Sequence, residues 1–203
     1  QDRRITGKGE VMNILKTSAT VFAVPLALLP LPVLAHPGHM AGHSAFVSGM
    51  LHPLTGVDHL AAMVMVGLWA GVAMRDKLWI APLLFLASAL GGYGFALSGF
   101  VLPLVEPIII ASLLMLGAGL ASRKRMSAGI ALSLIGLFGF AHGQAHGTEM
   151  ADHAFAMHFA AGFLCATALL HAIGIAAARV ASANISRIFG LLGMGLGIFL
   201  VTI

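Results

Sequence analysis

An aspartate and a histidine stand side by side at the start of an apolar segment of this sequence. Residues 52–63 read HPLTGVDHLAAM, so Asp58 and His59 lead into a long run of apolar residues. Ionisable side chains at membrane depth cost free energy and usually serve a function. In a helix, His59 and Met63 are four residues apart and share a face. This pair is therefore the first candidate for chemistry.

The same spacing occurs a second time in the chain. Residues 146–157 read HGTEMADHAFAM, and both segments follow the template H-x5-D-H-x3-M, the second around Asp152 and His153. Two of the four aspartates in the sequence meet every condition of the template. Both segments are expected to enter helices that cross a membrane in the same direction, which favours a parallel internal repeat.

An imidazole beside a carboxylate is a ligand set of borderline hardness. It suits Ni, Co, Zn or Cu and is poor for Ca or Mg. Asp58 could bind an ion directly, or it could accept the second N–H of a ligating histidine and fix its tautomer. Two other interpretations stay open: Asp58 and Asp152 could only favour helix starts through the helix dipole, and Met63 and Met157 could be packing residues.

Further candidate ligands follow an apolar segment near residue 142. His142 and His146 are four residues apart, and Glu149 follows them. Gly143 and Gly147 argue against a regular helix here, so the sequence predicts an outer loop over 143–149. In that loop the two histidines could be ordinary surface residues, while Glu149 is a candidate ligand or gate.

The composition is that of a membrane protein. Of 203 residues, 59% are hydrophobic and 9% are charged, and the mean hydropathy is +0.99. Soluble domains carry roughly 25% charged residues. The net charge of +4 comes from short Lys and Arg clusters between apolar runs, with no basic stripe for nucleic acid. The single Cys165 excludes a disulfide within the chain.

The apolar runs define the expected organisation. Residues 1–11 are interpreted as an upstream extension and residues 12–35 as a cleavable signal peptide, with cleavage after Ala35. Residues 36–203 then form one transmembrane domain, predicted to be an all-α bundle of six membrane-spanning helices with an internal parallel repeat. The six segments are about 54–74, 78–98, 107–121, 127–142, 150–178 and 186–202.

The positive-inside rule orients these helices. Cleavage would leave the new N-terminus outside, and every Lys and Arg after Lys16 then falls in a loop on the inner side. The C-terminus falls outside as well. Nine of the ten histidines lie on the outer side or in the outer part of a helix. Only His171 lies toward the inner end, and we expect its substitution to have a mild effect.

These motifs resemble a known family. The segments HPGH (36–39), HPLTGVDHLAAMVMVGLWA (52–70) and FAHGQAHGTE (140–149) are similar to the HupE/UreJ family of bacterial membrane proteins. The family is associated with hydrogenase and urease gene clusters and is regarded as nickel permeases, in some members cobalt permeases. The resemblance implies a location in the bacterial cytoplasmic membrane, with both termini of the mature chain in the periplasm.

The resemblance and the internal repeat together define a candidate metal site. The resemblance points to His36, His39, His52, Asp58, His59, His142, His146 and Glu149, and the repeat adds Asp152 and His153. We expect these residues to contact a transported ion, Ni²⁺ first and Co²⁺ next, with no permanently bound cofactor. The expected partners are that ion and the lipid bilayer, without nucleic acid. A homo-oligomer or an accessory protein is left open.

The sequence therefore predicts a secondary transporter rather than an enzyme, which imports a divalent transition metal for enzymes such as hydrogenase or urease. It contains no GxxxxGK phosphate-binding loop. The alternative is an intramembrane zinc-dependent hydrolase with His142 and His146 as ligands. A haem b electron carrier is a third interpretation, and it would need facing histidines deep in two helices.

Overall fold

The described parts of the chain are helical throughout. The computed structural model describes residues 42–122, 126–150 and 153–202, and within these ranges it contains no strand. The α-helices there are α2 (Gly42–Leu51), α3 (Val57–Ala73), α4 (Ile80–Leu97), α5 (Val105–Ala121), α6 (Ala128–Thr148), α7 (Ala156–Val180) and α8 (Ala183–Thr202). Short 3-10 turns lie at η2 (His52–Leu54), η3 (Arg75–Lys77) and η4 (His153–Phe155). The prediction of an all-α protein is confirmed.

Four of these helices are long and apolar enough to cross a membrane. They are α4, α6, α7 and Asn184–Thr202 of α8. Ser44–Leu54 and Val57–Ala73 form a fifth candidate, a helix pair bent by 81° that has the geometry of a broken span or a re-entrant loop. The remaining helix, α5, has 17 residues and covers about 26 Å, less than the roughly 30 Å of a bilayer core. Length and composition thus support four or five spans among the described residues, and the count of six stays a prediction.

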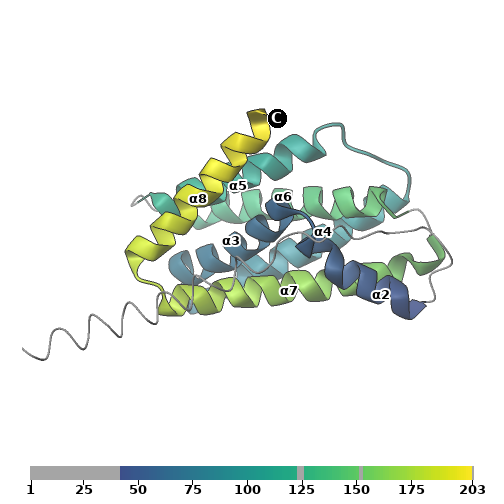
Figure 1. The fold of residues 1–203 in the computed structure, drawn as a ribbon, viewed down its shortest axis with the longest axis horizontal. Helices are drawn as coiled ribbons and strands as arrows, with labels where there is room; N and C mark the ends of the chain where they lie inside the picture. The colour runs from purple at the N-terminus through teal and green to yellow at the C-terminus, as the bar shows by residue number, and fades with distance from the viewer. Residues whose placement is uncertain (1–41, 123–125, 151–152, 203) are drawn as a thin grey trace, which may run out of the picture. The chain divides into compact units, whose positions relative to one another are not determined.

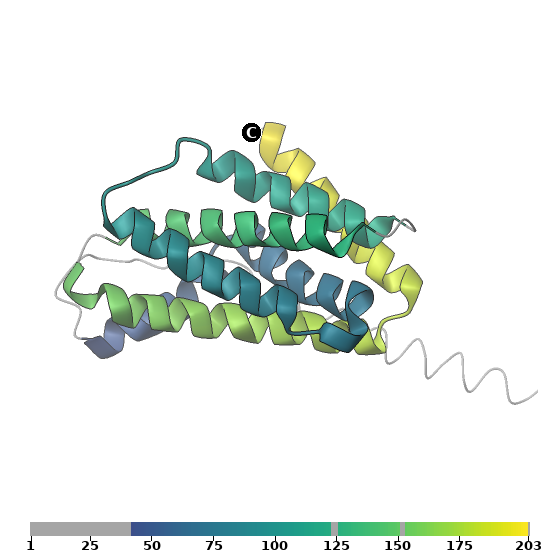
Figure 2. The same cartoon turned by 180° about the vertical axis from the view of Figure 1, so that it is seen from behind.

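The helices pack mainly in pairs. The closest pairs are α4 with α6, α3 with α7, α5 with α8, and α2 with α7 (Figures 1 and 2). The long α7 is covered by α2 along its first part, where Gly49 meets Phe159, and by α3 farther on, where Gly67 meets the backbone of His171. Close approach of this kind needs residues without a bulky side chain, as is usual between membrane helices.

Two segments differ from the sequence-based expectation. Residues 42–51 form the helix α2, which none of the six predicted segments includes, because this short helix is stabilised by packing on α7. The first predicted span, about 54–74, begins as an α-helix at Val57, and Leu54 lies in the preceding 3-10 turn η2. Asp58 therefore lies in the first turn of its helix, with Gly56 as the N-cap residue.

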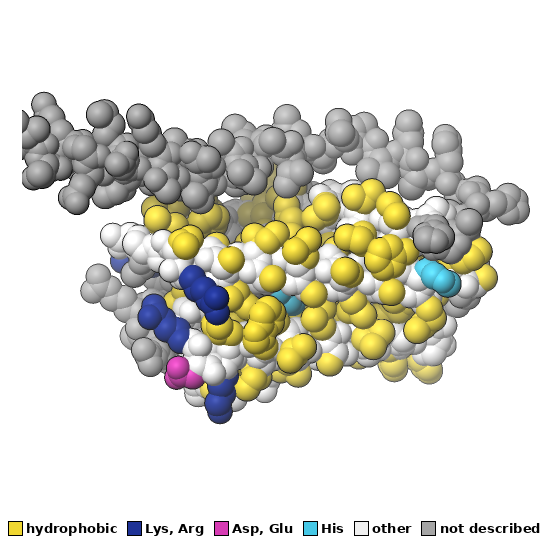
Figure 3. Space-filling model, turned by 90° about the horizontal axis from the view of Figure 1, so that it is seen from below, with side chains coloured by type: hydrophobic (Ala, Val, Ile, Leu, Met, Phe, Trp, Pro, Cys, Tyr) yellow, Lys and Arg dark blue, Asp and Glu magenta, His cyan; other side chains and the backbone are white. Residues whose placement is uncertain are grey.

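Lys and Arg side chains gather at one end of the face shown in Figure 3, and the histidine farthest from them lies near the other end. The basic end carries the exposed residues Arg75, Lys77, Arg179 and Arg187, which flank the ends of α3, α4, α7 and α8. The last turns of α6 lie toward the other end, and the break between α2 and α3 lies partway along α7, beyond the contact of Gly49 with Phe159 (Figure 1). The clustering of Lys and Arg at one end of the bundle is what the positive-inside rule leads us to expect from the sequence.

Candidate metal site

Glu149 brings two histidines together at the end of α6. The carboxylate oxygen Oε2 lies 2.5 Å from Nε2 of His52 and 3.6 Å from Nδ1 of His146. One ligand atom from each of the three residues can be chosen so that all lie within 4.8 Å of one another. A carboxylate only accepts hydrogen bonds, so Nε2 of His52 donates, which leaves its Nδ1 as a lone-pair nitrogen.

The neighbouring imidazoles also keep Glu149 ionised. His146 and His52 beside the carboxylate hold the pKa of Glu149 well below its usual range, against the opposing effect of partial burial. The side chain of His146 is almost fully buried, whereas that of Glu149 is more than half exposed. The trio therefore presents a negative charge toward the surface and imidazole nitrogens toward the interior.

Asp58 orients His59. Nδ1 of His59 lies 3.0 Å from Oδ1 of Asp58, and the geometry is that of a hydrogen bond donated to the carboxylate. Nε2 of His59 is buried and has no hydrogen-bond partner among the described residues. A carboxylate on one ring nitrogen fixes the tautomer and leaves the other nitrogen basic, as in many metal-binding histidines. Of the two roles that the sequence left open for Asp58, this geometry favours orientation of the ligand.

The backbone before Asp58 makes room for this pair. Gly56 is extended, and a Cβ atom there would lie 2.9 Å from Oδ1 of Asp58 and 3.1 Å from Nδ1 of His59. The preceding turn is closed by Thr55, whose amide and hydroxyl both donate to the carbonyl of His52. The turn and the glycine together place His52 and His59 on the same side of the broken span.

His142, like His59, has one ring nitrogen in a hydrogen bond and the other without a partner in the described structure. Its ring is fully buried, and Nδ1 donates a 2.8 Å hydrogen bond to the carbonyl oxygen of Phe138, one turn earlier on α6. A neutral imidazole carries only one N–H, so its Nε2 holds a lone pair. That atom is buried without a partner in the described structure, as are both ring nitrogens of His146.

These four imidazoles form a continuous row. Ring centroids lie 4.8 Å apart for His52 and His146, 4.7 Å for His146 and His59, and 5.0 Å for His59 and His142. We call these four residues the histidine row. Its members come from η2, α3 and α6, and the row extends from the partly exposed His52 to the fully buried His142. Imidazoles with unpaired nitrogens, flanked by two carboxylates, make a suitable ligand set for a borderline divalent metal.

The predicted loop at 143–149 is wrong for most of its length. The helix α6 continues through His142 and His146 to Thr148. Gly143 lies against the carbonyl oxygen of Ala89, and Gly147 against Tyr93 and Ala96, so α4 can approach without a side chain in the way. Tertiary packing therefore offsets the low helix propensity of glycine. The interpretation of His142 and His146 as ordinary loop histidines is wrong, because both are buried on one helix face.

Some predicted ligands are not brought into this cluster by the described structure. His36, His39 and Asp152 lie outside the described residues, and His153 is described only as part of the turn η4. The two methionines of the repeat differ in environment, since Met63 is fully buried and Met157 is 72% exposed. A Met157 ligand equivalent to Met63 is therefore not favoured.

Sequence reasoning missed Gln144, which lies between the two histidines of α6. Its fully buried amide accepts a 2.9 Å hydrogen bond from the backbone N–H of Leu102 and donates a 2.8 Å bond to the carbonyl of Phe100. These bonds fasten the connection between α4 and α5 to α6. A lone amide within an apolar helix is the signal that could have identified it.

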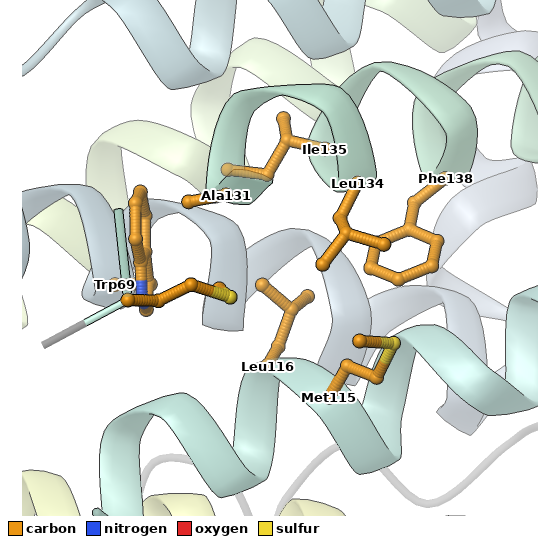
Figure 4. A pocket seen from close by; sticks show the side chains of 8 residues that line it. Trp69, Met115, Leu116, Ala131, Leu134, Ile135 and Phe138 are labelled. Atoms are coloured by element: carbon orange, nitrogen blue, oxygen red, sulfur yellow. The ribbon is translucent and has the colours of Figure 1, made fainter. Parts of the chain in front are cut away.

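A small cavity lies elsewhere in the bundle. It has a volume of about 10 Å³ and is bounded by apolar side chains that include Trp69, Leu116, Ile135 and Phe138 (Figure 4). A space of this size holds at most about one water molecule. It shares no residue with the histidine row, so it is not a substrate pocket for a metal held there.

Comparison with known proteins covers nearly all of the described structure. A family model described as "HupE / UreJ protein" matches residues 24–202. Protein HupE of Rhizobium leguminosarum bv. viciae is 36% identical over 156 residues, which are 76% of this chain and 81% of that protein. No solved structure matches. With the candidate spans, these matches make the chain a multi-pass membrane protein.

Proposed function

Because the chain belongs to the HupE/UreJ family, we propose that it is a secondary permease for a divalent transition metal, Ni²⁺ first and Co²⁺ next. The observation that supports this most directly is the histidine row. It contains buried imidazole nitrogens without partners, which cost free energy unless a ligand uses them. The row begins near the surface and leads inward, as an entry path for an ion would.

We propose that the ion enters the bundle near Glu149 and the histidine row and leaves at the basic end. Lys and Arg favour the cytoplasmic side of a bacterial inner membrane, and the exposed basic residues follow the ends of α3 and α7, whereas the histidine row lies near the start of α3 and in the last turns of α6. This orientation places Glu149 at the periplasmic end of α6 and makes the protein an importer. The metal would supply enzymes such as hydrogenase or urease.

Two carboxylates balance the charge of the ion in this proposal. Asp58 contacts one end of the imidazole pair His59–His142, and Glu149 contacts His52 and His146. A divalent cation between them is close to electroneutral, which lowers the cost of placing charge at membrane depth. The repeat offers Asp152 as a further candidate ligand, but Asp152 lies outside the described residues, so the proposal gives the second charge to Glu149.

No ATP hydrolysis is required for inward transport. Moving two positive charges inward along a membrane potential of about 100 mV gains roughly 4.6 kcal/mol, enough for about 10³-fold accumulation. His36 and His39, which lie outside the described residues, would add nitrogen donors ahead of the entry site. We assign them capture of the metal rather than its selection.

Uptake measurements test this proposal. Cells that lack their other nickel and cobalt importers should accumulate more Ni²⁺ or Co²⁺, measured by mass spectrometry of the washed cells, when the full chain is expressed. A His59→Ala, His142→Ala double variant at equal membrane abundance should return uptake to the background. Equal uptake with and without the protein, for both metals, would contradict the proposal. A zinc-dependent hydrolase is not favoured, because the chain belongs to the HupE/UreJ family, which is regarded as a family of metal permeases.

A further inference from the structure

One histidine outside the row is also buried without a partner. His171 lies in α7 with a fully buried side chain, and neither Nδ1 nor Nε2 has a hydrogen-bond partner in the described structure. A neutral imidazole has one donor and one acceptor to satisfy, and burying both unpaired costs stability. An apolar residue of similar size would avoid that cost, so packing alone does not explain a histidine here.

His171 continues the line of the histidine row toward the interior. The ring of Phe85, from α4, lies 5.3 Å from the ring of His142 on one side and 5.0 Å from that of His171 on the other, measured between centroids. His171 is thus separated from the end of the row by one aromatic ring. On the opposite side its backbone contacts Gly67 of α3.

Two further donor atoms lie between α3 and α7, the first of them one helical turn from His171 on α7. Thr167 precedes His171 by four residues on α7 and shares its face. The Thr167 hydroxyl donates a 3.3 Å hydrogen bond to the sulfur of Met63, and both side chains are fully buried. Met63 in turn lies one turn after His59 on α3. The thioether and the hydroxyl therefore occupy the interface between α3 and α7, beside the inner end of the row.

We propose that His171, Met63 and Thr167 form an inner station, a second binding site that receives the ion from the histidine row; this rests on the proposed function. The station offers an imidazole, a thioether and a hydroxyl. The carboxylates Asp58 and Glu149 lie with the histidine row, and we call the row and these two residues the outer cluster. Hard cations such as Mg²⁺ and Mn²⁺ prefer oxygen ligands, whereas Ni²⁺ and Co²⁺ accept nitrogen and sulfur. The station is therefore a selectivity step for borderline metals.

This inference reverses the expectation from the sequence that His171 is of little importance. That expectation followed from its position on the inner half, away from the other histidines. The structure adds that the side chain is fully buried, has unpaired nitrogens and is linked to the row through Phe85.

The decisive variant is His171→Leu in the full-length protein, compared with His158→Leu. His158 is on the same helix and is exposed, so it provides the same chemical change outside the station. Ni²⁺ uptake should fall about tenfold or more for His171→Leu and stay near wild type for His158→Leu. The purified His171→Leu protein should unfold at the same temperature as wild type or higher, and it should still bind Ni²⁺ at the outer cluster. A packing role for the imidazole predicts the opposite pattern, lower stability with normal uptake.

If His171→Leu does not reach the membrane, a second pair of variants tests the inner station. Met63→Leu removes the sulfur and keeps the volume, and Met157→Leu makes the same change at an exposed position. Uptake should fall for the first and not for the second. His171→Cys should restore part of the Ni²⁺ uptake and raise the relative uptake of Zn²⁺, because a thiolate is a softer donor.

The experiments distinguish a failure of the proposed function from a failure of the inner station. Wild-type protein that takes up neither Ni²⁺ nor Co²⁺ would overturn the proposed function and the inner station with it. Normal uptake by wild type, by His171→Leu and by Met63→Leu would overturn the inner station alone. A loss of Ni²⁺ binding at the outer cluster in His171→Leu would also overturn it, since the substitution would then act on the row itself.

Discussion

His59 donates its Nδ1 hydrogen to Oδ1 of Asp58 across 3.0 Å, so two neighbours in the sequence act as one unit. The carboxylate decides which nitrogen of the imidazole is free, and that nitrogen, Nε2, is the buried one. Orientation of this kind commonly raises the basicity of a ligating histidine. The pair at the start of α3 therefore has a structural reason to be adjacent.

The first prediction separates the charge of Asp58 from its hydrogen bond. In Asp58→Asn the amide oxygen can still accept from His59, but the negative charge is lost. Ni²⁺ uptake should fall about tenfold or more, while the amount of protein in the membrane stays near wild type. Asp76→Asn, in the exposed turn η3, is the matched control and should leave uptake unchanged. Wild-type uptake by Asp58→Asn at normal abundance would show that the pair is only a helix-end feature.

The second prediction concerns Glu149 and its two histidines. Glu149→Gln removes the charge that His52 and His146 share, and the Kd of the purified protein for Ni²⁺ should rise about tenfold, measured by titration calorimetry. His52→Ala should have a similar effect. The loss of Ni²⁺-binding free energy in the double variant should be smaller than the sum of the losses in the two single variants, because the two residues contact each other. Fully additive losses would mean that the two side chains act at separate sites.

The third prediction tests the packing that places the histidines of α6. A methyl group at Gly143 would overlap the carbonyl oxygen of Ala89, so Gly143→Ala should force α4 and α6 apart and cost about 1–3 kcal/mol of stability. Gly129→Ala is the control on the same helix, since a Cβ there meets no atom within 4 Å. It should be neutral or gain up to about 1 kcal/mol. Thermal unfolding in detergent measures both, and equal behaviour of the two variants would contradict the close contact.

The fourth prediction concerns the orientation in the membrane. Reporter fusions after Arg75 and after Glu149 should report opposite sides, with Glu149 in the periplasm. The reason is that Arg75 and Lys77 are exposed in one short turn at the basic end. A cytoplasmic signal at Glu149 would reverse the direction of transport and make the protein a candidate exporter.

The fifth prediction concerns the N-terminal segment. Cleavage after Ala35 would give His36 a free α-amine beside its own imidazole, a bidentate chelator that the precursor lacks. Pro37 has no amide N–H, which blocks a chelate through a deprotonated amide at that residue. N-terminal sequencing of the protein from membranes should begin at His36. Residues before His36 in that protein would remove the basis for this capture role.

The sequence alone predicted the properties that depend on local composition and spacing. Apolar runs of helical length are sufficient to predict an all-α membrane protein, because a backbone in lipid must satisfy its own hydrogen bonds. Ligand chemistry is equally local, since imidazole and carboxylate prefer the same metals wherever they lie. The motifs around Asp58 and around His142 were therefore recognisable, and so was the family. The spacing of His59 and Met63 predicted that they share a helix face, and both lie in α3.

Only the tertiary structure decided which of these residues meet. Ninety-seven positions separate His52 from Glu149, and their contact depends on the turn η2 and on how α3 and α6 are placed. Gly143 looked like a helix breaker, because sequence propensity does not include the neighbouring helix that uses the missing side chain. Met63 and Met157 hold matching positions in the sequence repeat, yet one is buried and the other exposed. His171 looked peripheral for the same reason: burial and unpaired nitrogens result from contacts between helices, which the spacing along one helix does not contain.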